Sequence, residues 1–207
     1  MIAPAGLFER AVTEWLPEPP RVVVLGLGNV LVGDDAFGPY VARTLQARYV
    51  MQDGVEVHDI GTPGLDLAPH LAGVEAAIIV DTVKSIAAPG TVSTWSMAQV
   101  LAKGPTPRTT PHQPGVVDTL YFLDIQGMAP HELLLVGVSP GRYDTGAPLS
   151  DDVRAAVDVA IALVACELER LGVPPILRDD PVDADIWWER TARRRPAVPG
   201  DAPNREM

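Results

Sequence analysis

Two adjacent aspartates, Asp34 and Asp35, end a glycine-rich segment that directly follows an apolar, β-branched run. The segment, residues 26–33, reads GLGNVLVG and precedes a helical pattern, so it leaves a sheet at the carboxyl end of a strand. Ligands and reacting groups of open α/β sheets gather at that edge. Two carboxylates there suit a cation or a proton-transfer step. An equally good interpretation is that both aspartates only cap the helix that follows.

A glycine-rich turn between a strand and a helix also suggests a dinucleotide site. That fingerprint requires a third glycine three residues after the second, and Leu31 occupies the position. The carboxylates of Asp34 and Asp35 would also oppose a pyrophosphate at the same helix start. A dinucleotide-dependent enzyme is therefore kept only as a distant alternative.

Two further aspartates follow strand-like runs. Asp81 comes directly after residues 77–80, and a carboxylate at the end of a buried strand is costly unless it is paired, hydrogen-bonded or bound to a metal. We therefore favour a functional role for Asp81 over a turn-capping one. Asp59 precedes the Gly-Thr-Pro-Gly segment 61–64, so ordinary turn chemistry also explains it and its functional case is weaker.

Among the four histidines, His112 is the candidate for chemistry. It lies between Pro111 and Pro114, directly before a helical pattern, so a stiff loop presents it. One imidazole with two carboxylates binds a borderline divalent ion such as Ni²⁺ or Zn²⁺ and leaves coordination positions open for a substrate. The other three histidines are interpreted as surface residues: His58, His70 and His131.

The sequence contains no His-Glu-x-x-His motif, and its Gly-x-Ser-x-Gly stretch, residues 137–141, is not followed directly by the helix that a nucleophile elbow requires. The single cysteine, Cys166, lies in an apolar helical stretch, which predicts a small buried side chain. It has no partner for an internal disulfide, which fits a reducing compartment. Conventional zinc, serine and cysteine proteases are therefore disfavoured.

The elements that must position these residues alternate between strand and helix. Strands are predicted over residues 22–25, 55–57, 77–80, 91–95 and 133–138, and helices around 37–45, 65–71, 116–125 and 150–172. The loop before residues 91–95 is too short for a crossover helix, so that strand is expected to be antiparallel and at an edge. The sequence therefore predicts a three-layer α/β/α sandwich around a mostly parallel five-stranded sheet with one antiparallel edge strand.

Composition divides the chain into three parts. Residues 1–20 end in a proline-rich, extended lead-in, residues 21–177 carry the α/β domain, and residues 178–207 form a charged, proline-bearing tail without an apolar period to build a core. The net charge of −11 disfavours nucleic acid and anionic membranes as partners. No signal peptide and no bilayer-spanning run is found, so a cytoplasmic protein is predicted.

Taken in order, these motifs resemble those of the [NiFe]-hydrogenase maturation proteases over about residues 21–173. The resemblance is carried by Gly26-x-Gly28-Asn29-x-Leu31-x-x-Asp34-Asp35-x-x-Gly38, Asp59-x-Gly61-Thr62-x-Gly64, Asp81 after Ile-Ile-Val, and Pro111-His112-Gln113. Each motif alone is weak, and the four in order are specific. Some members carry Glu at position 35, and Ala36 replaces a glycine common after the acidic pair.

The resemblance implies an endopeptidase that removes the C-terminal extension of a nickel-loaded hydrogenase large-subunit precursor. It implies that Asp35, Asp81 and His112 are metal ligands that read nickel supplied by the precursor, with no organic cofactor. Asp59 belongs to a motif linked to activity and completes the predicted catalytic set. Either a bound metal or a carboxylate such as Asp59 would activate the water. A binding module that recognises or chaperones the nickel centre without cutting is the alternative.

Overall fold

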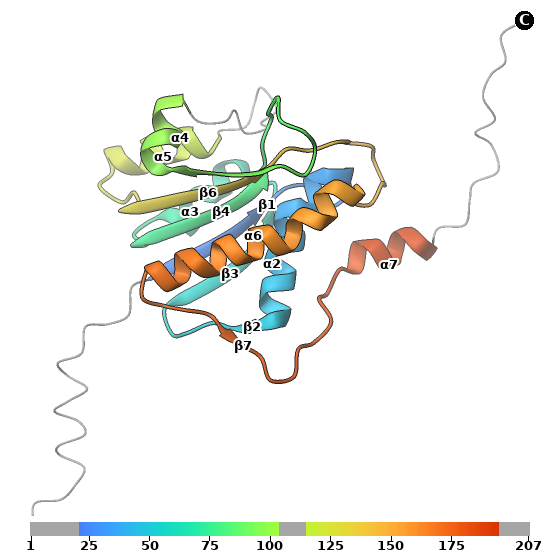
Figure 1. Cartoon of the computed structure of the whole chain (residues 1–207). Coiled ribbons are helices and arrows are strands. Elements are labelled where there is room, and N and C mark those ends of the chain that lie inside the picture. The colour runs from blue at the N-terminus through green and yellow to red at the C-terminus, as the bar shows by residue number, and fades with distance from the viewer. Residues whose placement is uncertain (1–20, 104–114, 195–207) are drawn as a thin grey trace, which may run out of the picture.

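The computed structural model describes residues 21–103 and 115–194 and contains a five-stranded sheet (Figure 1). Its strands are β1 (Val22–Leu27), β3 (Val55–Gly61), β4 (Ala76–Thr82), β5 (Val92–Ser96) and β6 (Glu132–Val138). Their order is β3-β1-β4-β6-β5. The β1–β3, β1–β4 and β4–β6 pairs are parallel, and β5 runs antiparallel to β6 at the edge. The predicted sheet is confirmed, including its antiparallel edge strand.

Helices cover both faces of this sheet, which gives three layers (Figure 1). The helices α2 (Phe37–Arg48) and α6 (Asp151–Arg170) lie on one face, and α3 (Ala68–Leu71), α4 (Met97–Lys103) and α5 (Val116–Ile125) lie on the other. Side chains of β1 alternate between the two cores, with Val22 and Val24 in the first and Val23 and Leu25 in the second. The strands are apolar without alternation because both of their faces are buried.

The start of α2 is pressed directly against the sheet. A Cβ atom added to Gly26 would lie 2.3 Å from the carbonyl oxygen of Gly38, and one added to Gly38 would lie 2.4 Å from the carbonyl oxygen of Val80. Only glycine therefore allows this approach of helix to strand. The contact brings the short 3-10 helix η1 (Gly33–Ala36), which carries both aspartates, to the carboxyl ends of β1 and β4.

Helix α6 begins where the sequence predicts, with Ser150 at the N-cap position and a buried stripe that includes Val153, Val157 and Val164. The Ser150 hydroxyl does not cap the helix, however, because it donates to the carboxylate of Asp34. The predicted burial of Cys166 is wrong, since its side chain is exposed. Position 166 is two residues beyond a buried position, so the helical period turns it away from the core.

The C-terminal part of the described chain packs back onto the domain. Strand β7 (Ile176–Leu177) pairs with β2 (Tyr49–Val50) in an antiparallel ladder, and helix α7 (Trp187–Arg194) follows beyond α2 and α6 (Figure 1). The side chains of Ile186 and Trp188 are buried. The sequence did not predict these contacts, because two buried residues in a charged segment do not produce a recognisable apolar periodicity. The domain boundary after residue 177 stays a prediction.

Arg154 of α6 ties α7 to the domain. Its guanidinium donates to Glu189 and to the hydroxyl of Tyr40, whose ring meets Trp188 edge-on at 6.4 Å. Burial by itself lowers the pKa of Arg154, and the hydrogen bonds to Glu189 and Tyr40 outweigh it, so the pKa is raised. None of the helices in residues 21–103 and 115–194 is long and apolar enough to cross a lipid bilayer.

Candidate active site

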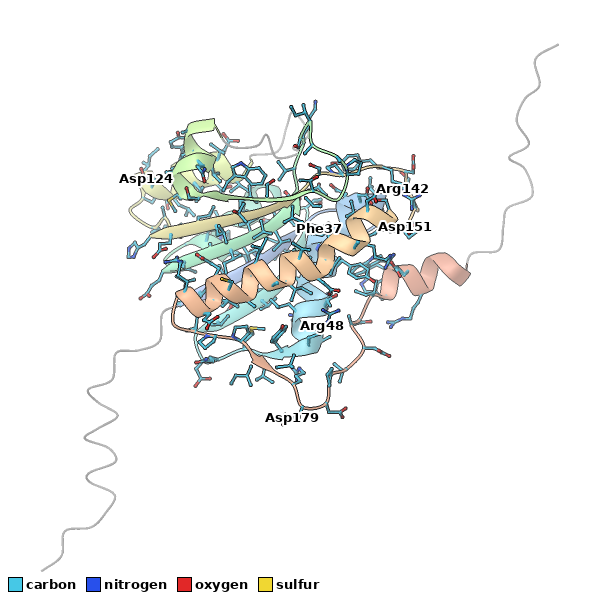
Figure 2. The ribbon with its side chains drawn as sticks, viewed as in Figure 1. Phe37, Arg48, Asp124, Arg142, Asp151 and Asp179 are labelled. Atoms are coloured by element: carbon cyan, nitrogen blue, oxygen red, sulfur yellow. The ribbon has the colours of Figure 1, made fainter. Side chains whose placement is uncertain are left out.

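Asp34 is a fully buried structural residue. Its carboxylate accepts hydrogen bonds from the backbone N–H groups of Gly141 at 2.7 Å, Arg142 at 2.9 Å and Ser150 at 2.6 Å. The Ser150 hydroxyl adds a fourth at 2.9 Å. Figure 2 shows Arg142 and Asp151 at the same end of α6, where this loop approaches the helix. Asp34 therefore fastens the loop before α6 and does not cap the helix that follows it in the chain.

Asp35 is half-buried and joins the ends of two neighbouring strands. Its Oδ2 accepts the backbone N–H of Asn29 at 2.9 Å, and its Oδ1 accepts the hydroxyl of Thr82 at 3.1 Å. Asn29 follows β1, and Thr82 ends β4. The carboxylate of Asp35 thus lies over the carboxyl edge of the sheet, as the sequence predicts.

Asp81 is half-buried and stands next to Thr82 at the end of β4. Its Oδ1 accepts the backbone N–H of Thr82 at 2.7 Å, while the hydroxyl of the same Thr82 donates to Asp35. Thr82 therefore contacts both carboxylates, Asp35 through its hydroxyl and Asp81 through its backbone N–H. Thr82 was not predicted as a site residue. The signal for it was only its place after Asp81 at the end of a buried strand.

His112, the third predicted ligand, lies outside the described residues. In the described part that follows, the N–H of Gly115 donates to Asp118, and the buried Val116 anchors the start of α5. In residues 21–103 and 115–194, no three side chains of His, Cys, Asp or Glu come together to hold a metal ion. A metal site with three ligands from this chain therefore needs a residue outside those ranges.

Asp59 is not brought to the other two carboxylates. The residues Asp59 and Val80 are both in register with Gly26 of β1, so the end of β3 lies two strand spacings, about 10 Å, from the end of β4. The carboxylate of Asp59 pairs instead with Arg43 of α2, at 3.2 Å from Nε. Its other oxygen accepts the backbone N–H of Gly61 at 3.3 Å.

Comparison with known proteins assigns the chain to a family. The family model for hydrogenase maturation proteases (HycI) matches residues 39–167, more than half of the chain. This chain belongs to the hydrogenase maturation protease family. The predicted enzyme class is thereby confirmed.

Individual relatives agree with this assignment. The protease is 36% identical over 160 residues to the Hydrogenase 2 maturation protease of Escherichia coli (strain K12), covering 77% of this chain and 97% of that protein. It is 35% identical over 161 residues to the hydrogenase expression/formation protein HoxM of Azotobacter vinelandii, covering 77% of this chain and 78% of that protein.

Solved structures resemble the protease over nearly their whole length. The hydrogenase maturating endopeptidase HybD from Escherichia coli superposes with a TM-score of 0.72 at 36% identity, covering 77% of this chain and 99% of that chain. The [NiFe] hydrogenase maturation protease HybD from Thermococcus kodakarensis has a TM-score of 0.56 at 31% identity, covering 70% and 96%.

The glycine-rich loop of the protease serves its own backbone rather than a phosphate. A phosphate cradle needs unoccupied N–H groups at the helix start. Here backbone N–H groups of the loop donate within the protein: Gly28 to Gly61, Asn29 to Asp35, Leu31 and Val32 to Asn29, and Asp35 to Val32. A Cβ atom on Gly28 would lie only 1.8 Å from the carbonyl oxygen of Asp35. These contacts, with the family assignment, argue against a dinucleotide site.

Two of the remaining histidines form a small cluster away from this loop. The rings of His58 and His70 lie 5.8 Å apart, and Nε2 of His58 is 2.9 Å from a carboxylate oxygen of Glu56. The hydrogen bond with His58 lowers the pKa of Glu56. Both rings are half-buried, whereas His131 is exposed. The prediction that these three histidines are surface residues is therefore fully met only by His131, and His58 and His70 are partly buried.

Proposed function

We propose that this protease removes the C-terminal extension of a [NiFe]-hydrogenase large-subunit precursor that already carries nickel, and that it does so in the cytoplasm. The observation that supports the proposal is the pair of carboxylates, Asp35 and Asp81, that Thr82 contacts at the carboxyl edge of the sheet. The relatives named above are proteases or formation proteins of hydrogenases. Members of this family are proteases, so the activity expected of the site is hydrolysis of one specific peptide bond.

The ligand set suits an ion that arrives with the substrate. Two carboxylates and the imidazole of His112 would leave coordination positions open. Each oxygen of Asp35 accepts one hydrogen bond, and a carboxylate oxygen has two lone pairs, so acceptor capacity remains for a metal. The free cysteine of the described residues, Cys166, lies exposed on α6 and contributes no thiolate to this edge of the sheet. We infer that nickel held by the precursor completes its coordination here.

The same arrangement explains why cleavage would follow nickel insertion. A precursor without nickel offers the carboxylates nothing to bind, so its cleavage site is not positioned. A loaded precursor gains several metal–ligand bonds, which hold the scissile peptide in place, and orientation of this kind contributes much of an enzyme's rate enhancement. A nickel ion bound in this way would also lower the pKa of a coordinated water, which could then attack the peptide carbonyl.

Intact-mass spectrometry of purified components tests the proposal. The wild-type protease is incubated with nickel-loaded precursor and, separately, with nickel-free precursor. We expect a shorter large subunit and a released C-terminal peptide only from the loaded precursor. A complex that forms without any change in mass would instead identify a recognition module. Equal cleavage of both precursors would refute the proposal that cleavage depends on nickel in the precursor.

A further inference from the structure

We infer that Asp59 is a positioning residue, which acts on Asp35 through Gly61 and Gly28 with Arg43 as its counter-ion, and is not the base that activates water. The inference rests on the proposed function, because it takes Asp35 as a ligand of the substrate's nickel. It concerns how the ligand is held in place. Each link in it is a contact between neighbouring residues.

Strand alternation separates Asp59 from the end of β4. Val57 packs in the core formed with α2 and α6, so Asp59, two residues further along β3, lies on the same face. Ile79 packs in the core formed with α3 and α5, so Asp81 lies on that opposite face. A base must reach its proton within a hydrogen-bond distance or through one water. Asp59 and Asp81 are two strands apart and on different faces, so they do not share one reacting water.

The carboxylate of Asp59 is already engaged at both oxygens. Oδ2 lies 3.2 Å from Nε of Arg43, and Oδ1 accepts the N–H of Gly61 at 3.3 Å. The exposed fraction of its side chain is only 11%. A general base needs an accessible lone pair that faces the attacking water. This environment matches a fixed structural anion better.

The contacts of Asp59 lead step by step to Asp35. Gly61 has a positive φ of 59°, and its carbonyl oxygen accepts the N–H of Gly28 at 2.8 Å. Gly28 in turn lies against the backbone of Asp35, where a Cβ atom would come within 1.8 Å of the carbonyl oxygen. The next residue, Asn29, donates its N–H to Oδ2 of Asp35.

This path crosses the point where the β1–β3 pairing is irregular. Gly26 is in register with Asp59, but Leu27 is in register with Gly61, so one residue of β3 is left over. Such bulges redirect a strand next to functional sites. The bond from Asp59 to the N–H of Gly61 closes this bulge, and Arg43 fixes Asp59 to α2. The bulge therefore fixes the position of the glycine-rich loop, and with it that of Asp35, relative to the end of β3.

Cleavage assays with four variants test the inference: Asp59→Asn, Asp59→Ala, Arg43→Ala and the Arg43→Ala/Asp59→Ala double variant. Asn keeps an oxygen that can accept the N–H of Gly61, so we expect Asp59→Asn to retain kcat within about tenfold and to keep the wild-type pH profile. Asp59→Ala and Arg43→Ala should lower kcat to similar extents. The double variant should be no worse than the poorer single variant, because both break one unit.

A general base behaves differently in each of these measurements. Its replacement by Asn would lower kcat by about 10²–10⁴-fold and remove the acid limb of the pH profile, which would overturn the inference. Independent losses that multiply in the double variant would overturn it too. The matched control is Arg48→Ala, which removes another ion pair of α2, with Asp158 at 2.5 Å, far from the glycine loop. It should leave kcat unchanged.

A spectroscopic measurement covers the case in which Asp59→Ala or Arg43→Ala is fully inactive. Backbone amide resonances of Gly61, Gly28 and Asn29 should shift in both variants and stay in place in Arg48→Ala. Unmoved resonances would refute the relay. If the wild-type protease fails to cut nickel-loaded precursor, the proposed function falls. If it cuts and Asp59→Asn alone is dead, only the present inference falls.

Discussion

Asp34 and Asp35 are adjacent in the chain, yet they share no hydrogen-bond partner. Asp34 binds the backbone of the loop before α6, whereas Asp35 binds Asn29 and Thr82 at the carboxyl edge of the sheet. Asp34 therefore stabilises the fold, whereas Asp35 lies at the candidate active site. Substitution of Asp34 should therefore mainly lower stability, and substitution of Asp35 should mainly abolish cleavage.

Asp34→Ala should destabilise the fold strongly. The change removes the carboxylate that accepts the N–H groups of Gly141, Arg142 and Ser150, and a hydrogen bond to a charged group contributes about 1.5–3 kcal/mol. We expect the free energy of unfolding, measured by urea denaturation, to fall by about 3 kcal/mol or more. The comparison variant is Asp35→Asn, which should unfold within about 1 kcal/mol of the wild type yet fail to process the precursor. Equal stability of the two variants would contradict the assignment of a structural role to Asp34 and a functional role to Asp35.

Gly28→Ala should inactivate the protease. The added Cβ would meet the carbonyl oxygen of Asp35 at 1.8 Å, so the backbone that presents this carboxylate must move. Gly73→Ala is the control, because Gly73 also has a positive φ but has nothing within 4 Å of the added atom. Both variants place an L residue at a positive φ, which costs on the order of 1–3 kcal/mol, and only Gly28→Ala should lose cleavage of loaded precursor. Similar activities in the two would show that the close approach is unimportant.

His112→Ala should abolish processing and leave stability nearly unchanged. The residue lies between two prolines, outside the apolar runs that build the core, and such substitutions usually change the free energy of unfolding by no more than about 0.5 kcal/mol. Thermal melting and mass spectrometry of the reaction products give the two readouts. His131→Ala, at an exposed position, serves as the control histidine. Normal processing by His112→Ala would remove that residue from the site.

Trp188→Ala should lower the free energy of unfolding by up to about 3 kcal/mol, since the side chain is 6% exposed and packs against Tyr40. Trp187→Ala, at a position that is 44% exposed, should cost less. Truncation after residue 177 should leave a core that still unfolds cooperatively, at a lower temperature than the full chain. Loss of all cooperative unfolding would make α7 part of the domain itself.

Chelation separates a nickel-reading protease from one with its own metal. The enzyme alone is treated with a chelator, freed of the chelator, and assayed against loaded and nickel-free precursors in metal-free buffer. Full activity toward the loaded precursor is expected, because two carboxylates and one imidazole make a weak site until the substrate supplies nickel. Activity that returned only after metal was added back to the enzyme would favour an ordinary metalloprotease.

The sequence predicted the fold well because both faces of the sheet are covered. The strands of residues 77–80 and 133–138 are apolar throughout, which only a buried central strand requires, and the short loop before β5 left no room for a crossover. The acidic residues at strand ends followed from the same topology. The sequence could thus place Asp35 and Asp81 at one edge of the sheet.

Contacts between distant segments were beyond the reach of sequence patterns. The pairing of Asp59 with Arg43 joins a strand end to a helix, and neither residue shows a period that reveals it. The different roles of Asp34 and Asp35 depend on which way each side chain turns from one short 3-10 helix. The burial of Trp188 depends on a helix whose core contact is a few residues long.

The hydrogen bonds of Asp34 have a consequence for the order in which the protein is made. Its partners Gly141 and Ser150 lie 107 and 116 residues further along the chain. Contacts of such long sequence separation form late, since a large loop must close first. A nascent chain that has released β1, α2 and β4 from the ribosome therefore already carries Asp35 and Asp81 but cannot yet fix the loop that presents Asp35. The protease should therefore become competent only when the start of α6 has emerged.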